Sequence, residues 1–308
     1  MKHGIIPVYK PRGLTSHDVV GKIRRLAGQK RVGHTGTLDP EVEGVLPICL
    51  GQATRLVEYI QELPKRYKGS LLLGTATDTE DQTGKVIEEV DVVKISQEEV
   101  EEVFSSFLGT IEQVPPMYSA VKVGGKRLYD LARQGVEVKR PSRQVTIYQL
   151  HCTRVTQGKR PQIDFDVVCS KGTYVRTLCV DIGRALGYPA HMASLIRTES
   201  GPFRTADCFT FSELELVAEK GSWEEVLTPL DAVLGHFPSV ILEEEDALRA
   251  LDGWSLQVDF EKGALSHHSL VRVYSESGRF CGLYRLEEPL AKPEKVFRDV
   301  DVECKSST

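Results

Sequence analysis

The strongest constraint on this chain is the stretch RVGHTGTLDPEVEGVLPICLGQATRL, residues 31–56, which joins a glycine-rich polar loop to an apolar run. Gly33 and Gly36 allow close backbone approach, while Pro40 fixes the chain beyond Asp39 and biases that residue toward extended geometry. A carboxylate beside the neighbouring apolar residues is partly desolvated, so it needs a cationic partner to remain ionised. We interpret the stretch as a rigid loop that presents Asp39. The alternative is a turn aspartate that caps a nearby amide.

Size and composition favour a globular protein with one large core, or with one large and one small core. The chain has 308 residues, of which 41% are hydrophobic. No apolar run approaches the roughly 20 residues that span a bilayer, and the first residues lack the apolar segment of a secretory signal. The seven cysteines have no C-x-x-C pair and the eight histidines have no ligand spacing. We therefore expect reduced thiols in a cytoplasm, no disulfide framework and no metal site.

The distribution of charge differs from the total. The formal net charge of −5 argues against a simple nucleic-acid binder, yet residues 1–40 carry a net +6 and residues 119–145 a net +5. Residues 231–308 carry a net −6. Local positive potential governs polyanion binding better than the total does. These two basic stretches indicate contact with a nucleic acid, unless they are only solvated surface faces.

Hydrophobic periodicity and turn residues predict a mixture of helices and strands. Ser16 is expected to cap the first helix, and Ser96 with Glu99 is expected to form a capping box. From about residue 236 to 302 the pattern indicates a small β-rich module with a hairpin that turns at Ser277–Gly278. The predicted helices span residues 16–28, 53–63, 96–109 and 172–187, and the predicted strands span residues 65–74, 144–156, 162–170 and 294–300, with residues 76–86 as a loop between strands.

Several motifs together resemble those of the TruB-type tRNA pseudouridine synthases, a family that makes the pseudouridine at position 55 of the tRNA T-loop. The resemblance runs in the family's order over about residues 3–235. Its motifs are YKPRGLTSHDVV, GHTGTLDPEVEGVLP, KRYKGSLLLGTATDTEDQTG, QVPPMYSAVKVGGKRLYDLARQG and SKGTYVRTLCVDIGRALG.

The resemblance implies an α+β fold with two domains. A pseudouridine synthase catalytic domain, residues 1–235, would be built on a mixed, largely antiparallel sheet flanked by helices. It would carry an RNA-gripping insertion at about residues 118–143. Residues 236–302 resemble, more weakly, a PUA-like RNA-binding domain.

The resemblance also implies three catalytic residues. Asp39 corresponds to the carboxylate that acts at the sugar's anomeric carbon, by direct addition to C1′ or through a glycal. Arg176 corresponds to the arginine that pairs with it, and a guanidinium suits this task because it stays charged and binds carboxylates in bidentate fashion. Tyr67 corresponds to the active-site tyrosine, whose ring can stack on uracil. Taken alone, these two would be a surface arginine on a helix and a half-buried strand tyrosine.

Further positions are expected to bind the substrate. His34 corresponds to a histidine that holds the T-loop with its target base flipped out, and Lys10 and Leu195 correspond to residues that line the pocket. Gly36 and Thr37 belong to the same loop as Asp39. In the insertion, Lys126, Arg127 and Arg133 are expected to reach phosphates. The family often has a second basic residue where Ile196 precedes Arg197, which leaves one phosphate contact in question.

The resemblance therefore implies an isomerase that acts on tRNA in the cytoplasm as a monomer, without a cofactor and without a membrane. One alternative is an RNA-binding or RNA-folding module without turnover, in which the Asp39 loop is structural. A nucleotide-binding enzyme is disfavoured, because no G-x-x-x-x-G-K-[ST] occurs and no G-x-G-x-x-G follows a strand.

Overall fold

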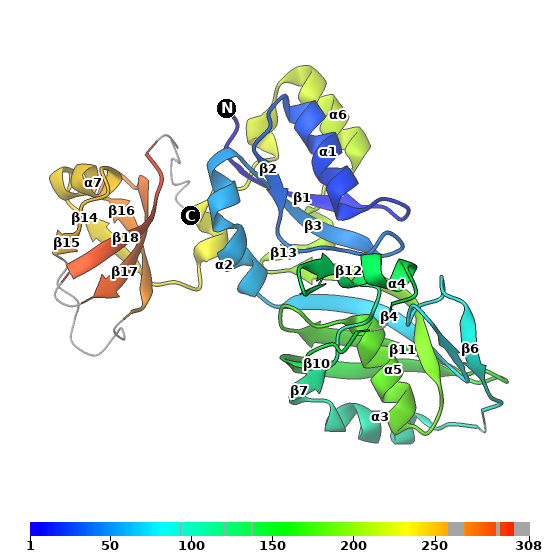
Figure 1. The fold of residues 1–308 in the computed structure, drawn as a ribbon. Coiled ribbons are helices and arrows are strands. Elements are labelled where there is room, and N and C mark those ends of the chain that lie inside the picture. The colour runs from blue at the N-terminus through cyan, green and yellow to red at the C-terminus, as the bar shows by residue number, and fades with distance from the viewer. Residues whose placement is uncertain (93, 120, 137, 258–267, 288–289, 299–308) are drawn as a thin grey trace.

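Two β-sheets organise the chain in the computed structural model (Figure 1). The structure describes residues 1–92, 94–119, 121–136, 138–257, 268–287 and 290–298. A nine-stranded sheet uses strands up to Phe203–Arg204, and a five-stranded sheet begins at Ser239. The predicted domain boundary near residue 236 thus falls between two sheets.

The larger sheet runs in the order β1-β3-β12-β4-β11-β10-β7, with β2 paired to β3 and β13 paired to β12. All of these pairs are antiparallel except β3 with β12, which confirms the predicted mixed, largely antiparallel sheet. Its strands are β1 (Gly4–Lys10), β2 (Val32–His34), β3 (Glu43–Leu50), β4 (Lys65–Leu73), β7 (Gly109–Gln113), β10 (Arg143–Thr156), β11 (Gln162–Cys169), β12 (Ala190–Ser200) and β13 (Phe203–Arg204).

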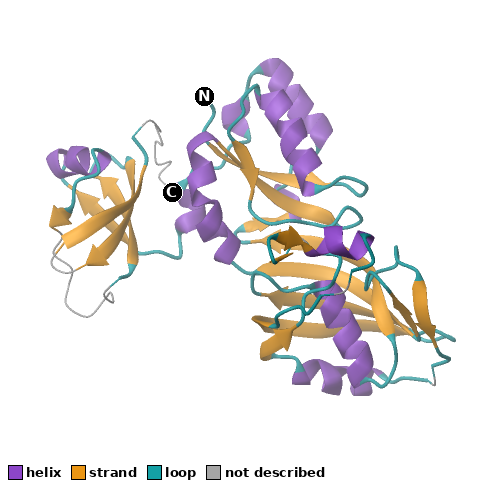
Figure 2. Ribbon diagram, viewed as in Figure 1, coloured by secondary structure: helices purple, strands orange, loops and turns teal. Residues whose placement is uncertain are grey.

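Helices flank this sheet, as Figure 2 shows. Helix α5 packs on β12, α3 packs on β10, and α1 contacts both β2 and α6. No helix in the described ranges is long and apolar enough to cross a membrane. The helices are α1 (Ser16–Ala27), α2 (Val57–Glu62), α3 (Gln97–Ser106), α4 (Leu128–Arg133), α5 (Val175–Ala185), α6 (Phe211–Lys220) and α7 (Glu244–Leu251), with 3-10 turns at Gly51–Leu56, Thr205–Asp207, Trp223–Glu225 and Asp231–Leu234.

Of the two predicted helix caps, that of α3 is confirmed and that of α1 is wrong. Ser96 and Glu99 form the predicted capping box of α3, with the Glu99 N–H donating to Ser96 Oγ at 3.2 Å. The N-cap of α1 is Thr15 and not Ser16, because the Thr15 side chain accepts from the Asp18 N–H at 3.1 Å. Ser16 is instead buried, so its hydroxyl is available for a tertiary contact.

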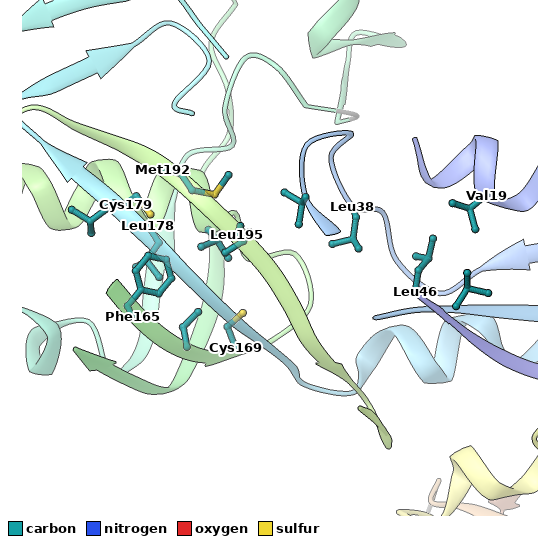
Figure 3. Close-up of a cluster of buried hydrophobic side chains, with 14 of the residues drawn as sticks. Val19, Leu38, Leu46, Phe165, Cys169, Leu178, Cys179, Met192 and Leu195 are labelled. Atoms are coloured by element: carbon teal, nitrogen blue, oxygen red, sulfur yellow. The ribbon is translucent and has the colours of Figure 1, made fainter. Parts of the chain in front are cut away.

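One apolar core lies under the large sheet and includes the loop that precedes Asp39. The alternate residues 163, 165, 167 and 169 of β11 are buried on one face, as their period of two predicts. Leu38 and Leu46 belong to the same cluster as Phe165 and Leu195, and Figure 3 draws these side chains. The Asp39 loop is therefore anchored in the core by the residue next to the carboxylate.

Two short hairpins project from this scaffold. The stretch predicted as a loop between strands, residues 76–86, includes the end of β5 (Thr75–Thr77) and the start of β6 (Val86–Glu89), which pair with each other. In the insertion, β8 (Lys122–Val123) pairs with β9 (Lys126–Arg127) ahead of α4. Gly124 and Gly125 form the turn of that hairpin with φ of 58° and 82°, values that glycine adopts readily.

The second sheet has the order β14-β16-β17-β18-β15 and packs against α7. It contacts the rest of the chain through α2 and the turn before it: Arg55 donates to the Val296 carbonyl at 2.6 Å and Tyr59 donates to Glu294 at 2.9 Å. The predicted last strand starts earlier than expected, at Leu290. The strands are β14 (Ser239–Leu242), β15 (Leu256–Gln257), β16 (Leu270–Ser275), β17 (Phe280–Glu287) and β18 (Leu290–Val296).

Candidate active site

The loop that carries Asp39 is held by backbone contacts on both sides of that residue. Ser16 Oγ accepts from the Leu38 N–H at 2.8 Å and donates to the Leu38 carbonyl at 3.2 Å. Beyond the aspartate, the Pro40 carbonyl accepts from Lys10 Nζ at 3.0 Å. Because both neighbours of Asp39 are fixed, the N-terminal segment sets the direction of its carboxylate.

Arg176 joins Asp39 to two other segments. From the first turn of α5, its Nε lies 3.0 Å from Asp39 Oδ2. Its Nη1 donates to the Thr79 carbonyl at 3.0 Å and lies 3.7 Å from Asp81 Oδ2. Its Nη2 donates to the Tyr118 carbonyl at 2.9 Å. With its side chain only 7% exposed, this guanidinium connects the Asp39 loop, the stretch after β5 and the start of the insertion.

The charge state of Asp39 reflects opposing influences. Burial raises the pKa of Asp39 above its ordinary value, and the nearby Asp81 carboxylate raises it further. Arg176 is the main influence that lowers the pKa, and Lys10 also lowers it. The side chain is still 43% exposed, so it can meet a ligand from outside. A buried cation and a half-exposed carboxylate suit a site that acts on a developing positive charge.

Tyr67 lies in the centre of the sheet, opposite Arg197 in the β4–β12 pair. Burial raises the pKa of the Tyr67 hydroxyl, whereas the positive charge of Arg197 lowers it. Asp39 is close enough to raise the pKa of Tyr67 as well. On β12, Leu195 is 7% exposed and faces Gly69, where an added Cβ would meet Leu195 Cδ1 at 2.8 Å. The predicted tyrosine and leucine thus share neighbouring strands.

His34 and the loop glycine after it form a local pair. His34 Nδ1 accepts from the Gly36 N–H at 3.2 Å, which leaves Nε2 to carry the proton of the neutral ring. Burial lowers the pKa of His34, and Arg197 and His17 lower it further. The imidazole is therefore neutral near pH 7. Thr37 is exposed at the rim of the loop.

Lys10 has a different role from the predicted one. It is completely buried, and its Nζ donates to the carbonyls of Pro11 at 2.9 Å, Leu14 at 2.7 Å and Pro40 at 3.0 Å. Burial lowers the pKa of Lys10 to about 8. An ammonium has three donors, so none remains for a ligand. Lys10 holds the Asp39 loop and does not line a pocket.

The insertion is anchored by two buried leucines and by a hydrogen bond to the chain just before it. Leu128 and Leu131 of α4 are buried, and Arg140 donates to the Pro115 carbonyl at 2.8 Å. The side chains predicted to reach phosphates, those of Lys126, Arg127 and Arg133, lie outside the described part of the structure.

Three residues of the site were not predicted from the sequence as members of it. Ser16 was expected to be a helix cap, Asp81 was one of several acidic residues in a polar stretch, and Arg197 was named only as the neighbour of Ile196, where the family often has a second basic residue. The available signal was their position inside motifs that already contained Lys10, Tyr67 or Leu195, but contact between the motifs is a tertiary property.

A pocket of about 350 Å³ lies elsewhere, at the start of β4 and against residues 232–236. It is lined by Lys65 and Arg66 but not by Asp39, Tyr67 or Arg176. We assign the site from its side-chain chemistry, since a bound nucleic acid would itself supply the second wall. Within the described ranges, no three His, Cys, Asp or Glu residues gather as a metal site.

Comparisons with known proteins match almost the whole chain. The family model described as TruB family pseudouridylate synthase, N-terminal domain, matches residues 24–175, and that of the tRNA pseudouridylate synthase B C-terminal domain matches residues 176–235. A Bacillus licheniformis protein named tRNA pseudouridine synthase B is 48% identical over 302 residues, 96% of this chain and 98% of that protein. One of the same name from Geobacillus thermodenitrificans is 51% identical over 300 residues, 96% and 99% of the two chains.

Solved structures with a similar fold include chains of two macromolecular complexes. A Cbf5–Nop10–Gar1 complex contains a chain with a TM-score of 0.72 and 27% identity, matched over 96% of this chain and 86% of that one. An H/ACA RNP bound to a substrate RNA containing 2′-deoxyuridine contains another with a TM-score of 0.72, 26% identity and the same two coverages.

Proposed function

Because the chain belongs to the TruB family of pseudouridylate synthases, we propose that it isomerises uridine 55 in the T-loop of tRNA to pseudouridine. The relatives' names support tRNA as the substrate. The observation that carries the proposal is the ion pair between Asp39 and the buried Arg176, at 3.0 Å, in a loop fixed on both sides.

Asp39 supplies the carboxylate at C1′ of the target ribose. The C1′–N1 bond breaks, the uracil turns over, C1′ bonds to C5, the C5 proton leaves and N1 gains one, so product and substrate have the same atoms. In the direct route the carboxylate adds to C1′. In the glycal route the Asp39 carboxylate removes the C2′ proton as the C1′–N1 bond breaks, and the protonated acid returns that proton to C2′ when C1′ bonds to C5. Both routes need an ionised Asp39, and Arg176 keeps it ionised by lowering its pKa. The chain's own side chains suffice for these steps, and we propose that it uses no cofactor.

The target base reaches Asp39 by leaving the T-loop stack. A neutral His34 ring fills the space that the base vacates, and burial already holds it uncharged. Tyr67 stacks on the uracil, and Leu195 closes the apolar side of the pocket. Bound RNA together with these groups keeps water from the activated sugar, which water would otherwise hydrolyse.

Affinity for tRNA comes from the basic insertion, with Lys126, Arg127 and Arg133 on phosphates. Residues 236–302 act as a PUA-like domain with a modest grip on the acceptor stem, because this part of the chain is acidic. We place the enzyme in the cytoplasm, since the free cysteines of the described part include five that are buried, an arrangement suited to a reducing compartment.

Replacing Asp39 tests the proposal. Asp39→Asn keeps the size of the side chain but removes its charge, so we expect no detectable conversion of a tRNA T-loop while binding affinity stays within about threefold. Pseudouridine is mapped by chemical labelling of the RNA, and binding is measured by filter retention. Asp164→Asn is the control, because Asp164 lies on β11 in a long ion pair with Arg154, at 3.6 Å.

Retained conversion by Asp39→Asn would reject the catalytic assignment. Wild-type protein that binds tRNA but leaves every uridine unchanged would favour the module without turnover. Conversion at a uridine other than 55 would keep the chemistry and reject the site of action.

A further inference from the structure

Arg197 is a buried cation with no assigned role in the proposed reaction. It lies on β12 with 1% of its surface exposed. Its Nε donates to the Val45 carbonyl at 2.7 Å and its Nη2 to the Gly36 carbonyl at 3.2 Å. No ion pair to a carboxylate of the described residues accompanies these bonds. A buried guanidinium held only by neutral partners is costly, which calls for a role beyond stability.

The backbone around Arg197 leaves little freedom. Residue 197 pairs with Gly44 of β3 on one side and with Tyr67 of β4 on the other. An added Cβ at Gly44 would lie 2.2 Å from the Arg197 carbonyl oxygen, so only glycine allows this approach. Residue 197 therefore lies between β3, the strand that follows the Asp39 loop, and β4, the strand that carries Tyr67.

Several groups of the site respond to this one charge. Arg197 pairs with Tyr67 across β12 and β4, and its charge lowers the pKa of the Tyr67 hydroxyl. It also lowers the pKa of His34 and of Lys10. Its contact with the Gly36 carbonyl reaches the Asp39 loop three residues before the carboxylate.

We propose that Arg197 is a positioning residue that fixes the Asp39 loop, through Gly36, relative to Tyr67 on the neighbouring strand. It acts on the reaction through these two groups and does not touch the RNA, because its side chain is buried. This inference rests on the proposed function. Misplacing reacting groups by about 1 Å can cost roughly 100-fold in rate.

The test compares Arg197→Met, Arg197→Lys and Arg66→Met. Arg66 is the matched control: it precedes Tyr67 on β4 and pairs with both oxygens of Asp166, at 2.8 and 3.0 Å, away from Asp39. We expect Arg197→Met to lower the single-turnover rate by about 100-fold. Arg197→Lys should lower it by about tenfold, since an ammonium keeps the charge but is not a planar fork that holds two fixed carbonyls. The single-turnover rate of Arg66→Met should stay within about twofold of the wild-type rate, even if its melting temperature falls as far as that of Arg197→Met.

Binding measurements separate this role from a phosphate contact. We expect the tRNA dissociation constant of each Arg197 variant to stay within about twofold, with an unchanged salt slope. Weaker binding with a slope reduced by about one and a normal single-turnover rate would mean that Arg197 contacts RNA. A double variant with Tyr67→Phe should be slowed less than the product of the two single effects, because Arg197 acts partly through Tyr67.

A wild-type single-turnover rate in a folded Arg197→Met would overturn the proposal. If that variant does not fold, Arg197→Lys decides, and a wild-type rate there would overturn it equally. These results are distinct from failure of the proposed function, which Asp39→Asn reports: an inactive Asp39→Asn together with a fully active Arg197→Met would reject the positioning role and leave the catalytic carboxylate in place.

Discussion

At the scale of single residues, the site depends on how one guanidinium is shared. Arg176 lies 3.0 Å from Asp39 and 3.7 Å from Asp81, and it also serves two backbone carbonyls. Asp39 is the closer partner, so Arg176 opposes the effect of burial on that carboxylate, while Asp81 adds to it. The pKa of Asp39 therefore depends on two side chains, Arg176 and Asp81, and neither of them touches the substrate in our proposal.

The pH dependence of the reaction tests this balance. Activity needs the Asp39 carboxylate, so the rate falls as pH drops through its pKa. Arg176 lowers that pKa, so Arg176→Met should move the acid limb of the single-turnover rate to higher pH. Asp81 raises the pKa, so Asp81→Asn should move the limb to lower pH, whatever happens to the plateau. At pH values well below the limb, moving it by about one pH unit changes the rate about tenfold.

The informative observation is the direction of the two displacements. Limbs that move the same way in both variants, or that stay fixed while the plateau falls, would show that a group other than Asp39 controls the acid side of the profile.

At the scale of elements, two consecutive residues at the start of α1 make different contacts. Thr15 caps the helix through Asp18, and Ser16, the next residue, binds the backbone of Leu38. The capping job is local, whereas the second one joins the first helix to the catalytic loop 22 residues further on. The order of residues in the N-terminal motif thus separates helix stability from loop placement.

Alanine substitutions at the two positions should separate these jobs. Ser16→Ala leaves the buried Leu38 N–H without a partner and Thr15→Ala removes a cap, so each should lower the free energy of unfolding by about 1–2 kcal/mol. Only Ser16→Ala should slow the single-turnover reaction, by about tenfold, because only Ser16 touches the loop. The measurements are urea unfolding and single-turnover kinetics on both proteins. Equal rates in the two variants would contradict a role for Ser16 in placing Asp39.

At the scale of the whole molecule, basic and acidic residues are concentrated in different parts of the chain. The N-terminal 40 residues and the insertion are basic, whereas the last 78 residues are acidic. The acidic part packs against α2 through Phe280, Leu283 and Phe297, in one apolar cluster with Leu56 and Ile60. A polyanion would be drawn to the basic regions first. The chain can hence have a net charge of −5 and still bind RNA.

Salt dependence tests this division. Alanine at Lys126, Arg127 and Arg133 should weaken tRNA binding and reduce the slope of log K against log salt by about 2–3, at roughly 0.7–0.9 for each lost phosphate contact. The control removes the same number of charges elsewhere, at Arg154, Arg184 and Arg249. All three are exposed and are paired with nearby carboxylates. If both triple variants change the slope equally, total charge and not the insertion governs binding.

Local signals sufficed for much of this protein. The period of two along β11, the Ser96–Glu99 box and the breaks at glycine and proline are properties of neighbours in sequence, so most helices and strands could be predicted from them. The mixed, largely antiparallel sheet followed from the resemblance to the family and not from these local signals. The residue types of the Asp39 loop also indicated a carboxylate that needs a cation. Arg176 followed from its motif, and the structure brings the two together at 3.0 Å.

The tertiary structure alone decided which polar residues serve the loop. Ser16, Lys10 and Arg197 are each compatible with a cap, a pocket lining or a phosphate contact when read in their own segments. Their donors instead bind the backbone carbonyls of Leu38, Pro40 and Gly36. Burial removes water as a partner, so each of these groups must bond to whatever the fold places nearby. That placement depends on strand order and packing, which no single segment contains.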